Sequence, residues 1–231
     1  MRRALIAGLL ILQPIGAARA EEVGIVLNVV QLVEVRGFPP SGEPSWLLEK
    51  RNPIERGLKV KLVGPKAELA IGFTSNFGCW FKGDQRVSIG AFLAVRRESD
   101  VDFGDASAPC YPKVKVNRGR IRLASLVSDN QPEVETPHAR IKEGGTVLRV
   151  AVDPVVGTFV AVDEGSVSVQ AIDETKSSIG EPVVVGAGQW VLVPPNGLPT
   201  RPSPLPADDE LLEDPLLPCC TVIEPPKPPA P

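Results

Sequence analysis

Apolar and polar residues alternate in short segments along most of this chain. The alternation is clearest at residues 59–62, 113–116 and 166–169, and it recurs at 68–73 and 120–123. A period of two places one set of side chains on a buried face and the other set on a wet face, as in a half-buried β-strand. Gly, Pro, Asn and Asp residues separate these segments. The sequence therefore predicts an all-β fold, an antiparallel sandwich or roll of many short strands.

The segments between the predicted strands give more specific expectations. Residues 117–119 have the composition of a turn, which predicts a hairpin between the strands at 113–116 and 120–123. Residues 38–53 and 99–112 lack alternation and are expected to form long loops. The short apolar run at 181–185 suits a strand that is covered on both faces.

The N-terminus has the three parts of a secretory signal peptide. A positive start (MRR) precedes an apolar run at residues 4–12, and Ala18 and Ala20 are the small residues before the expected cleavage site at Glu21. The apolar run is about half of the roughly 20 residues that a membrane-spanning helix needs. Residues 1–20 are therefore predicted to be a cleaved signal peptide rather than an anchor. We expect a periplasmic or secreted protein without a membrane span.

The composition divides the rest of the chain at residue 194. Residues 21–193 are predicted to form the all-β domain. From 194 to 231, 13 of 38 residues are Pro, which predicts an extended, disordered tail. The tail contains one acidic segment with two leucines, DDELLED at residues 208–214, which reads either as a solvated linker or as a short docking motif.

The net charge argues against nucleic acid as a partner. The full chain carries −3. Loss of Arg2, Arg3 and Arg19 with the signal peptide leaves 22 basic residues against 28 acidic ones. A protein that follows a phosphate backbone is usually basic.

Four cysteines suit an oxidising compartment. We expect Cys79 to pair with Cys110, with two buried free thiols as the alternative. Cys219 and Cys220 are adjacent in the tail, where they could bridge each other or another chain. A redox catalyst normally carries a C-x-x-C motif, which is absent from this sequence.

The order of several motifs resembles the FecR domain of bacterial periplasmic proteins. The resembling segments are 57–60 (GLKV), 67–71 (AELAI), 116–122 (VNRGRIR), 135–137 (ETP), 145–150 (GTVLRV), 159–169 (FVAVDEGSVSV) and 183–189 (VVVGAGQ). These residues form turns and strands, so the resemblance predicts architecture rather than activity.

The resemblance also implies a setting for the protein. The best-known members of the family carry a cytoplasmic anti-sigma segment and a membrane helix, and their periplasmic domain contacts the signalling domain of a receptor. This sequence is expected to lack that segment and that helix. It therefore resembles the freestanding secreted members of the family.

No pattern in the sequence predicts a catalytic centre, a cofactor or a metal. His138 is the only histidine, and it is expected on a surface or in a loop. No G-x-S-x-G motif surrounds any serine, so the pattern of a serine hydrolase is absent from the sequence. Asp100, Asp102 and Asp105 could hold a cation in a loop, but their spacing differs from that of an EF-hand, so a solvated acidic loop is expected. The chain is predicted not to be an enzyme.

Two features are candidate partner-binding sites. The first is a set of alternating basic residues, which on a hairpin would form one basic ribbon: Lys113, Lys115, Arg118, Arg120 and Arg122. It could meet an acidic protein, an anionic wall polymer or the acidic tail of the chain itself, or it could be a solvated face. The second is Trp80 in the aromatic cluster FGCWF, read either as core packing or as a contact patch.

These observations predict a non-enzymatic interaction module that binds an envelope protein or a cell-wall component. Recognition would use a surface or an edge strand of a rigid sheet. One alternative is a sensory component that passes a signal to a separate membrane regulator. Another is an envelope enzyme that uses carboxylates or a loop metal, with Asp100 and Asp102 as its residues.

Overall fold

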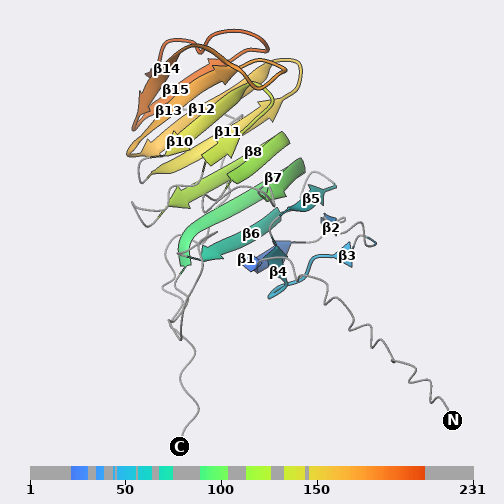
Figure 1. The fold of residues 1–231 in the computed structure, drawn as a ribbon. Helices are drawn as coiled ribbons and strands as arrows, with labels where there is room; N and C mark the ends of the chain where they lie inside the picture. The colour runs from blue at the N-terminus through green and yellow to red at the C-terminus, as the bar shows by residue number, and fades with distance from the viewer. Residues whose placement is uncertain are drawn as a thin grey trace, which may run out of the picture.

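The described part of the protein consists of β-strands and their connections. The computed structural model describes residues 22–30, 35–38, 44, 46–55, 57–63, 68–74, 89–103, 113–125, 133–143 and 146–205 (Figure 1). Its strands are β1 (Glu22–Val30), β2 (Val35–Phe38), β3 (Trp46–Leu47), β4 (Pro53–Glu55), β5 (Leu58–Leu62), β6 (Glu68–Thr74), β7 (Ile89–Phe103), β8 (Lys113–Ser125), β9 (Glu133–Glu135), β10 (Ala139–Glu143), β11 (Val147–Asp153), β12 (Gly157–Glu164), β13 (Ser166–Ile172), β14 (Ser178–Gly186), β15 (Gln189–Val193) and β16 (Ser203–Pro204). The all-β prediction is confirmed.

Two long antiparallel strands, β7 and β8, run through the middle of the fold. They pair with each other from Ala91 opposite Ser125 to Phe103 opposite Val114. The edge of β7 that faces away from β8 pairs with β6 through residues 89–96 and with β5 through residues 100–103. The edge of β8 that faces away from β7 pairs with β11 through residues 119–124 and with β9 through residues 113–115. The sheet therefore divides into two branches on each side of the β7–β8 pair.

The two branches on the β8 side form two layers of a sandwich. One layer has the strand order β9-β10-β13-β14 and the other has the order β11-β12-β15-β16; we call them the β14 layer and the β15 layer. Their buried side chains belong to one apolar core, among them Ile141, Val169 and Val185 from the β14 layer and Val150, Val160 and Val191 from the β15 layer. The outer surfaces of the two layers therefore face in opposite directions.

The layers separate at an irregularity in β8. Val114 and Val116 are buried before it, and Ile121 and Leu123 are buried after it. In an unbroken strand every second residue is buried, so the buried residues would be either all even-numbered or all odd-numbered. The change from even to odd numbers shows that β8 contains an extra residue between Val116 and Ile121, as in a β-bulge. The register of β7 against β8 shifts at the same place. The predicted hairpin turn at 117–119 is therefore wrong, because these residues lie inside one continuous strand.

Three other expectations about local structure need correction. Residues 99–103 form the end of β7, and short strands occur at 46–47 and 53–55, so the expected long loops are shorter. β14 is an edge strand with Val184 67% exposed, so it is not covered on both faces. Strand pairing also continues past residue 193, where we expected the tail to begin. Ser203 in β16 is opposite Trp190, and Leu205 N–H donates to Gly188 O at 2.9 Å.

Several predictions fall outside the described residues. These are the signal peptide at 1–20, the pair Cys79 and Cys110, Trp80, and the part of the tail that contains residues 206–231 with Cys219 and Cys220. Among the residues that the structure does describe, none belongs to a helix with the length and apolarity needed to cross a membrane.

Candidate functional site

The fold distributes the predicted basic residues over both outer surfaces. Lys113 lies on the outer surface of the β14 layer, where its Nζ contacts Glu135 and lies 3.4 Å from Glu133 Oε1. Arg122 lies on the outer surface of the β15 layer, where its Nη2 is 3.4 Å from Asp163 Oδ2. Because the bulge in β8 separates the two groups, the five residues do not form one ribbon.

Around Lys115 the charges alternate across neighbouring strands. The strand register places Lys59, Asp102, Lys115, Glu135 and Arg140 in one row across β5, β7, β8, β9 and β10. Opposite charges on directly paired residues stabilise a sheet modestly. This row therefore alternates three cationic with two acidic side chains and is not a run of basic residues.

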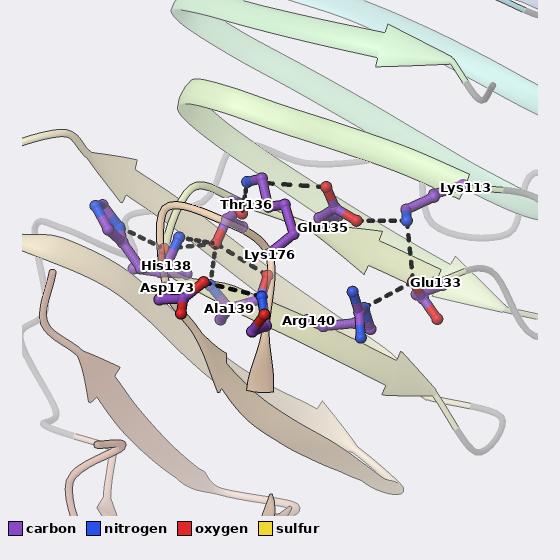
Figure 2. A network of polar contacts seen from close by, with 11 residues as sticks. Lys113, Glu133, Glu135, Thr136, His138, Ala139, Arg140, Asp173 and Lys176 are labelled. Atoms are coloured by element: carbon purple, nitrogen blue, oxygen red, sulfur yellow. Dashed lines mark hydrogen bonds and ion pairs between the residues drawn. The ribbon is translucent and has the colours of Figure 1, made fainter. Parts of the chain in front are cut away.

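Glu135 is the most buried carboxylate of this row. Burial alone would raise its pKa, but the hydrogen bond and charge of Lys113, with the charges of Lys176 and Lys115, outweigh burial and lower the pKa. Lys176 Nζ lies 3.8 Å from Glu135 Oε1 and donates to Thr136 O at 3.3 Å. Lys176 thus ties the β13–β14 turn to the end of β9 (Figure 2).

The pKa of Asp102 is shifted in the opposite direction from the pKa of Glu135. Burial raises its pKa, and the charge of Asp100 adds to the effect, while Lys59, Asn117 and Lys115 act against it. Asp100 lies 3.7 Å from Lys61 Nζ. Asp100 and Asp102 are therefore both neighbours of lysines in β5. Asp105, the third member of the predicted acidic loop, lies outside the described residues.

A buried chain of hydrogen bonds joins the two layers at one end of the sandwich. The Thr136 hydroxyl oxygen accepts from Ala139 N–H at 2.8 Å and from His138 N–H at 3.2 Å. It lies 2.8 Å from Thr158 Oγ1, which lies 3.2 Å from His138 Nδ1. Thr136 and His138 belong to the β9–β10 turn of the β14 layer, and Thr158 belongs to β12. We call this group of side chains the threonine–histidine bridge.

His138 is buried, contrary to the expectation of a surface or loop residue, with 7% of the residue exposed. Burial lowers its pKa, and the charge of Lys176 acts in the same direction. The Thr136 hydroxyl, which accepts two hydrogen bonds, donates its proton to Ala139 O at 3.2 Å, and Thr158 Oγ1 lies within hydrogen-bond distance of both Thr136 Oγ1 and His138 Nδ1. Thr158 is 0% exposed, so its hydroxyl is closed to a substrate in this arrangement.

Next to this bridge are two tight turns, and in each of them an aspartate side chain accepts hydrogen bonds from residues of the same turn. Asp153 Oδ1 accepts from the N–H groups of Val155 at 2.8 Å and Val156 at 3.0 Å. These backbone hydrogen bonds lower the pKa of Asp153. Asp173 accepts from the Thr175 hydroxyl at 2.6 Å and from Ser177 N–H at 2.9 Å, which lowers its pKa in the same way.

The β11–β12 turn presents apolar side chains to solvent. Val155 is 84% exposed and Val156 is 48% exposed. The turn lies near the bridge because it leads directly into β12, whose first two residues are Gly157 and Thr158. We call Val155 and Val156 the valine tip. An aspartate-fixed turn that displays two valines is a preorganised apolar contact.

A second surface lies on the outside of the β15 layer. The strand register makes Arg122, Arg149, Ala161 and Trp190 one row across β8, β11, β12 and β15. The adjacent row is Arg120, Ala151, Phe159 and Leu192. Arginines therefore gather on the β8–β11 side and aromatic residues on the β12–β15 side. We call this surface, Arg120, Arg122, Arg149, Phe159, Asp163 and Trp190, the arginine–aromatic face.

The side chains on this face make two kinds of contact, a stack of aromatic rings and ion pairs. The Phe159 and Trp190 rings are stacked, with centroids 5.9 Å apart and planes 20° apart. Arg149 Nη2 donates to Asp163 Oδ1 at 2.7 Å, and Arg122 approaches the other oxygen of the same carboxylate. One carboxylate thus lies between two guanidinium groups.

Sequence reasoning missed both the valine tip and the arginine–aromatic face. The signal for the tip was present, since an Asp followed by Pro and a Gly four residues later is typical of a turn. The face could not be found in this way, because its residues come from four strands. Within the described residues, no group of three acidic, histidine or cysteine side chains is arranged to hold a metal ion.

Comparison with known proteins gives a distant likeness. No protein-family model matches the chain, and no curated protein matches it. One similar solved structure is that of a protein described as a "putative anti-sigma factor" from Parabacteroides distasonis. The match has 13% sequence identity and a TM-score of 0.41, and it covers 49% of this chain and 51% of the other.

Proposed function

We propose that this protein is a non-enzymatic, extracytoplasmic interaction module of the FecR type that binds an envelope protein or a cell-wall component. The observation that carries the proposal is the valine tip. Exposed valines cost free energy in water unless a partner covers them, and burial of a Val side chain contributes about 1.5–3 kcal/mol. An apolar contact of this kind favours a protein as the partner over a glycan.

The surroundings of the tip support a rigid recognition element. Asp153 fixes the backbone of the tip, and the threonine–histidine bridge joins the two layers beneath it. A binding residue on a fixed backbone loses little conformational entropy when it binds. The order of the FecR-like motifs and the secretory leader in the sequence support the family and the location.

Photocrosslinking in cells tests this proposal. A photoreactive amino acid replaces Val155 in the full-length chain, and in a control it replaces Val184, an exposed valine on the edge strand β14. The expected result is a discrete protein adduct from position 155 and none from position 184. Adducts from position 184 alone would contradict recognition through the tip and favour edge-strand pairing.

The identity of the adduct separates the candidate functions. A membrane regulator attached at position 155 would make the protein a sensory component. Adducts with wall glycan alone would replace the protein partner by a wall component. If neither position gives an adduct in cells that contain the folded protein, the proposal of an interaction module through this surface is wrong.

A further inference from the structure

We propose that Asn196 is a modification site, at which the chain forms a succinimide without an enzyme and then converts to aspartate and isoaspartate. This site lies in the loop between β15 and β16, and the proposal does not depend on the proposed function. Asn196 is the only asparagine of the sequence that a glycine follows. Glycine has no side chain that would block closure of the succinimide ring, so an asparagine before glycine cyclises most readily.

The reaction needs only the asparagine, the next backbone amide and water. The backbone nitrogen of Gly197 loses its proton and attacks Cγ of Asn196. A bond forms between this nitrogen and Cγ, the bond between Cγ and Nδ2 breaks, and Nδ2 leaves as ammonia with the proton. Water then opens the five-membered ring. Opening at Cγ gives aspartate, and opening at the main-chain carbonyl gives isoaspartate, whose backbone runs through Cβ.

The structure places Asn196 at the tip of a tight turn. Gly197 N–H donates to Pro194 O at 3.1 Å, and Asn196, the third residue of this turn, has a φ of +53°. A proline second and an asparagine third suit a type II turn. Pro195 and Asn196 are both exposed. Hydrogen bonds in an exposed turn open far more often than those in a core strand, so the attacking nitrogen becomes available in the folded protein.

Two other asparagines lack the features of this site and serve as internal controls. Asn52 precedes Pro53, whose nitrogen carries no hydrogen and cannot attack. Asn117 lies within strand β8, where the bulky Arg118 follows it. We therefore expect both side chains to remain amides under conditions in which Asn196 reacts.

Isoaspartate in this loop would disturb a contact between the two layers. A Cβ atom at Gly180 would overlap Leu198 Cδ2, so Leu198 of the loop lies directly on β14. Two residues later, Thr200 N–H donates to Leu192 O at 2.8 Å. An isoaspartyl bond adds one atom to the main chain between β15 and these contacts. We therefore expect Leu198 to leave Gly180 and the hydrogen bond of the Thr200 amide to open more often.

Ageing of the purified chain tests the proposal. Mass spectrometry of proteolytic peptides measures aspartate and isoaspartate at each asparagine, in native buffer and in guanidinium chloride. The expected result is conversion at Asn196 in both solvents and none at Asn52 or Asn117 in native buffer. The rate should rise with pH, because the attacking nitrogen must lose its proton. An Asn196 that stays intact in native buffer while it converts in denaturant would overturn the proposal, as would equal conversion of Asn117.

A variant separates the reaction from its structural consequence. Asn196→Gly keeps a residue that adopts a positive φ and removes the side-chain amide, so no product should form at this position. Hydrogen exchange of the Thr200 amide should be about tenfold faster in aged than in fresh protein, and ageing should not change it in the variant. Equal exchange in the aged protein and the aged variant would show that Leu198 stays in place, and would overturn the predicted effect on the loop.

Discussion

Gly119 in β8 packs directly against Ser99 in β7. A Cβ atom at Gly119 would lie 2.0 Å from the Ser99 hydroxyl oxygen and 2.5 Å from the Ser99 Cα. The same hydroxyl accepts from Arg120 N–H at 3.0 Å. Gly119 has a φ of +98°, which L side chains rarely adopt. This contact fixes the bulge at which the two layers separate.

Substitution Gly119→Ala should therefore destabilise the protein strongly. The methyl group requires a shift of the Ser99 backbone, and the positive φ adds strain, so we expect a loss of about 3 kcal/mol or more in the free energy of unfolding. Gly188→Ala is the matched control. Gly188 also has a positive φ of +72°, but a Cβ there meets no atom within 4 Å, so we expect a loss of about 1 kcal/mol. Equal losses in denaturant unfolding would contradict the role of the Ser99 contact.

The threonine–histidine bridge gives a second prediction. Thr158→Val removes the hydroxyl at nearly constant volume and leaves the buried Thr136 and His138 groups short of a partner, which should cost about 1–3 kcal/mol. Thr146→Val is the control, because Thr146 is also buried but its hydroxyl has no hydrogen-bond partner among the described residues. That change should be neutral or stabilising. Thermal unfolding of both variants checks the difference.

Acid should weaken the fold through His138. Its pKa is lowered in the folded protein, so the unfolded chain binds a proton at a higher pH than the folded chain does. Stability from this residue is present above the unfolded pKa of about 6.5 and is lost as the pH falls through the folded pKa, by up to about 1.4 kcal/mol per pH unit. We expect the melting temperature to fall between about pH 7 and pH 5.5, and His138→Gln to flatten this dependence. An unchanged slope in the variant would exclude His138 as its cause.

Gln170 should control the opening of the edge strand β14. Its side-chain amide donates to the carbonyl oxygens of Ile179, Gly180 and Ala171 at 2.9–3.1 Å, where the register of β13 against β14 shifts. Gln170→Met removes these hydrogen bonds, and we expect amide exchange at residues 178–182 to become about tenfold faster. Ser168→Ala, on the same face of β13, should not change it. Equal exchange in both variants would contradict the role of the amide.

Properties of single segments could be predicted well from the sequence. Alternation at 113–116 and 120–123 correctly identified Val114, Val116, Ile121 and Leu123 as one set of side chains and their charged neighbours as the other. Gly165, which lies between two strand segments of the sequence, has a positive φ of 77°, a conformation that glycine favours in turns. These features depend on a few adjacent residues, so the local pattern contains them.

Predictions failed where a residue's environment comes from a distant segment. His138 follows a proline in a turn and looked exposed, but Thr158 and the other layer bury it. The residues 117–119 looked like a turn, because a bulge and a turn both favour Asn and Gly. Only the pairing of β8 with β9 on one part of its edge and with β11 on the other distinguishes the two structures.

Local alternation is enough to predict that this chain forms strands, where most of them lie and which side chains point inward, because burial of every second residue is a local demand. The pairing of strands from distant segments placed Lys113 and Arg122 on opposite outer surfaces, stacked Phe159 on Trp190 and enclosed His138. Strand pairing joins residues that are far apart in the chain. Its free energy comes from the shared core of the two layers, which no single segment contains.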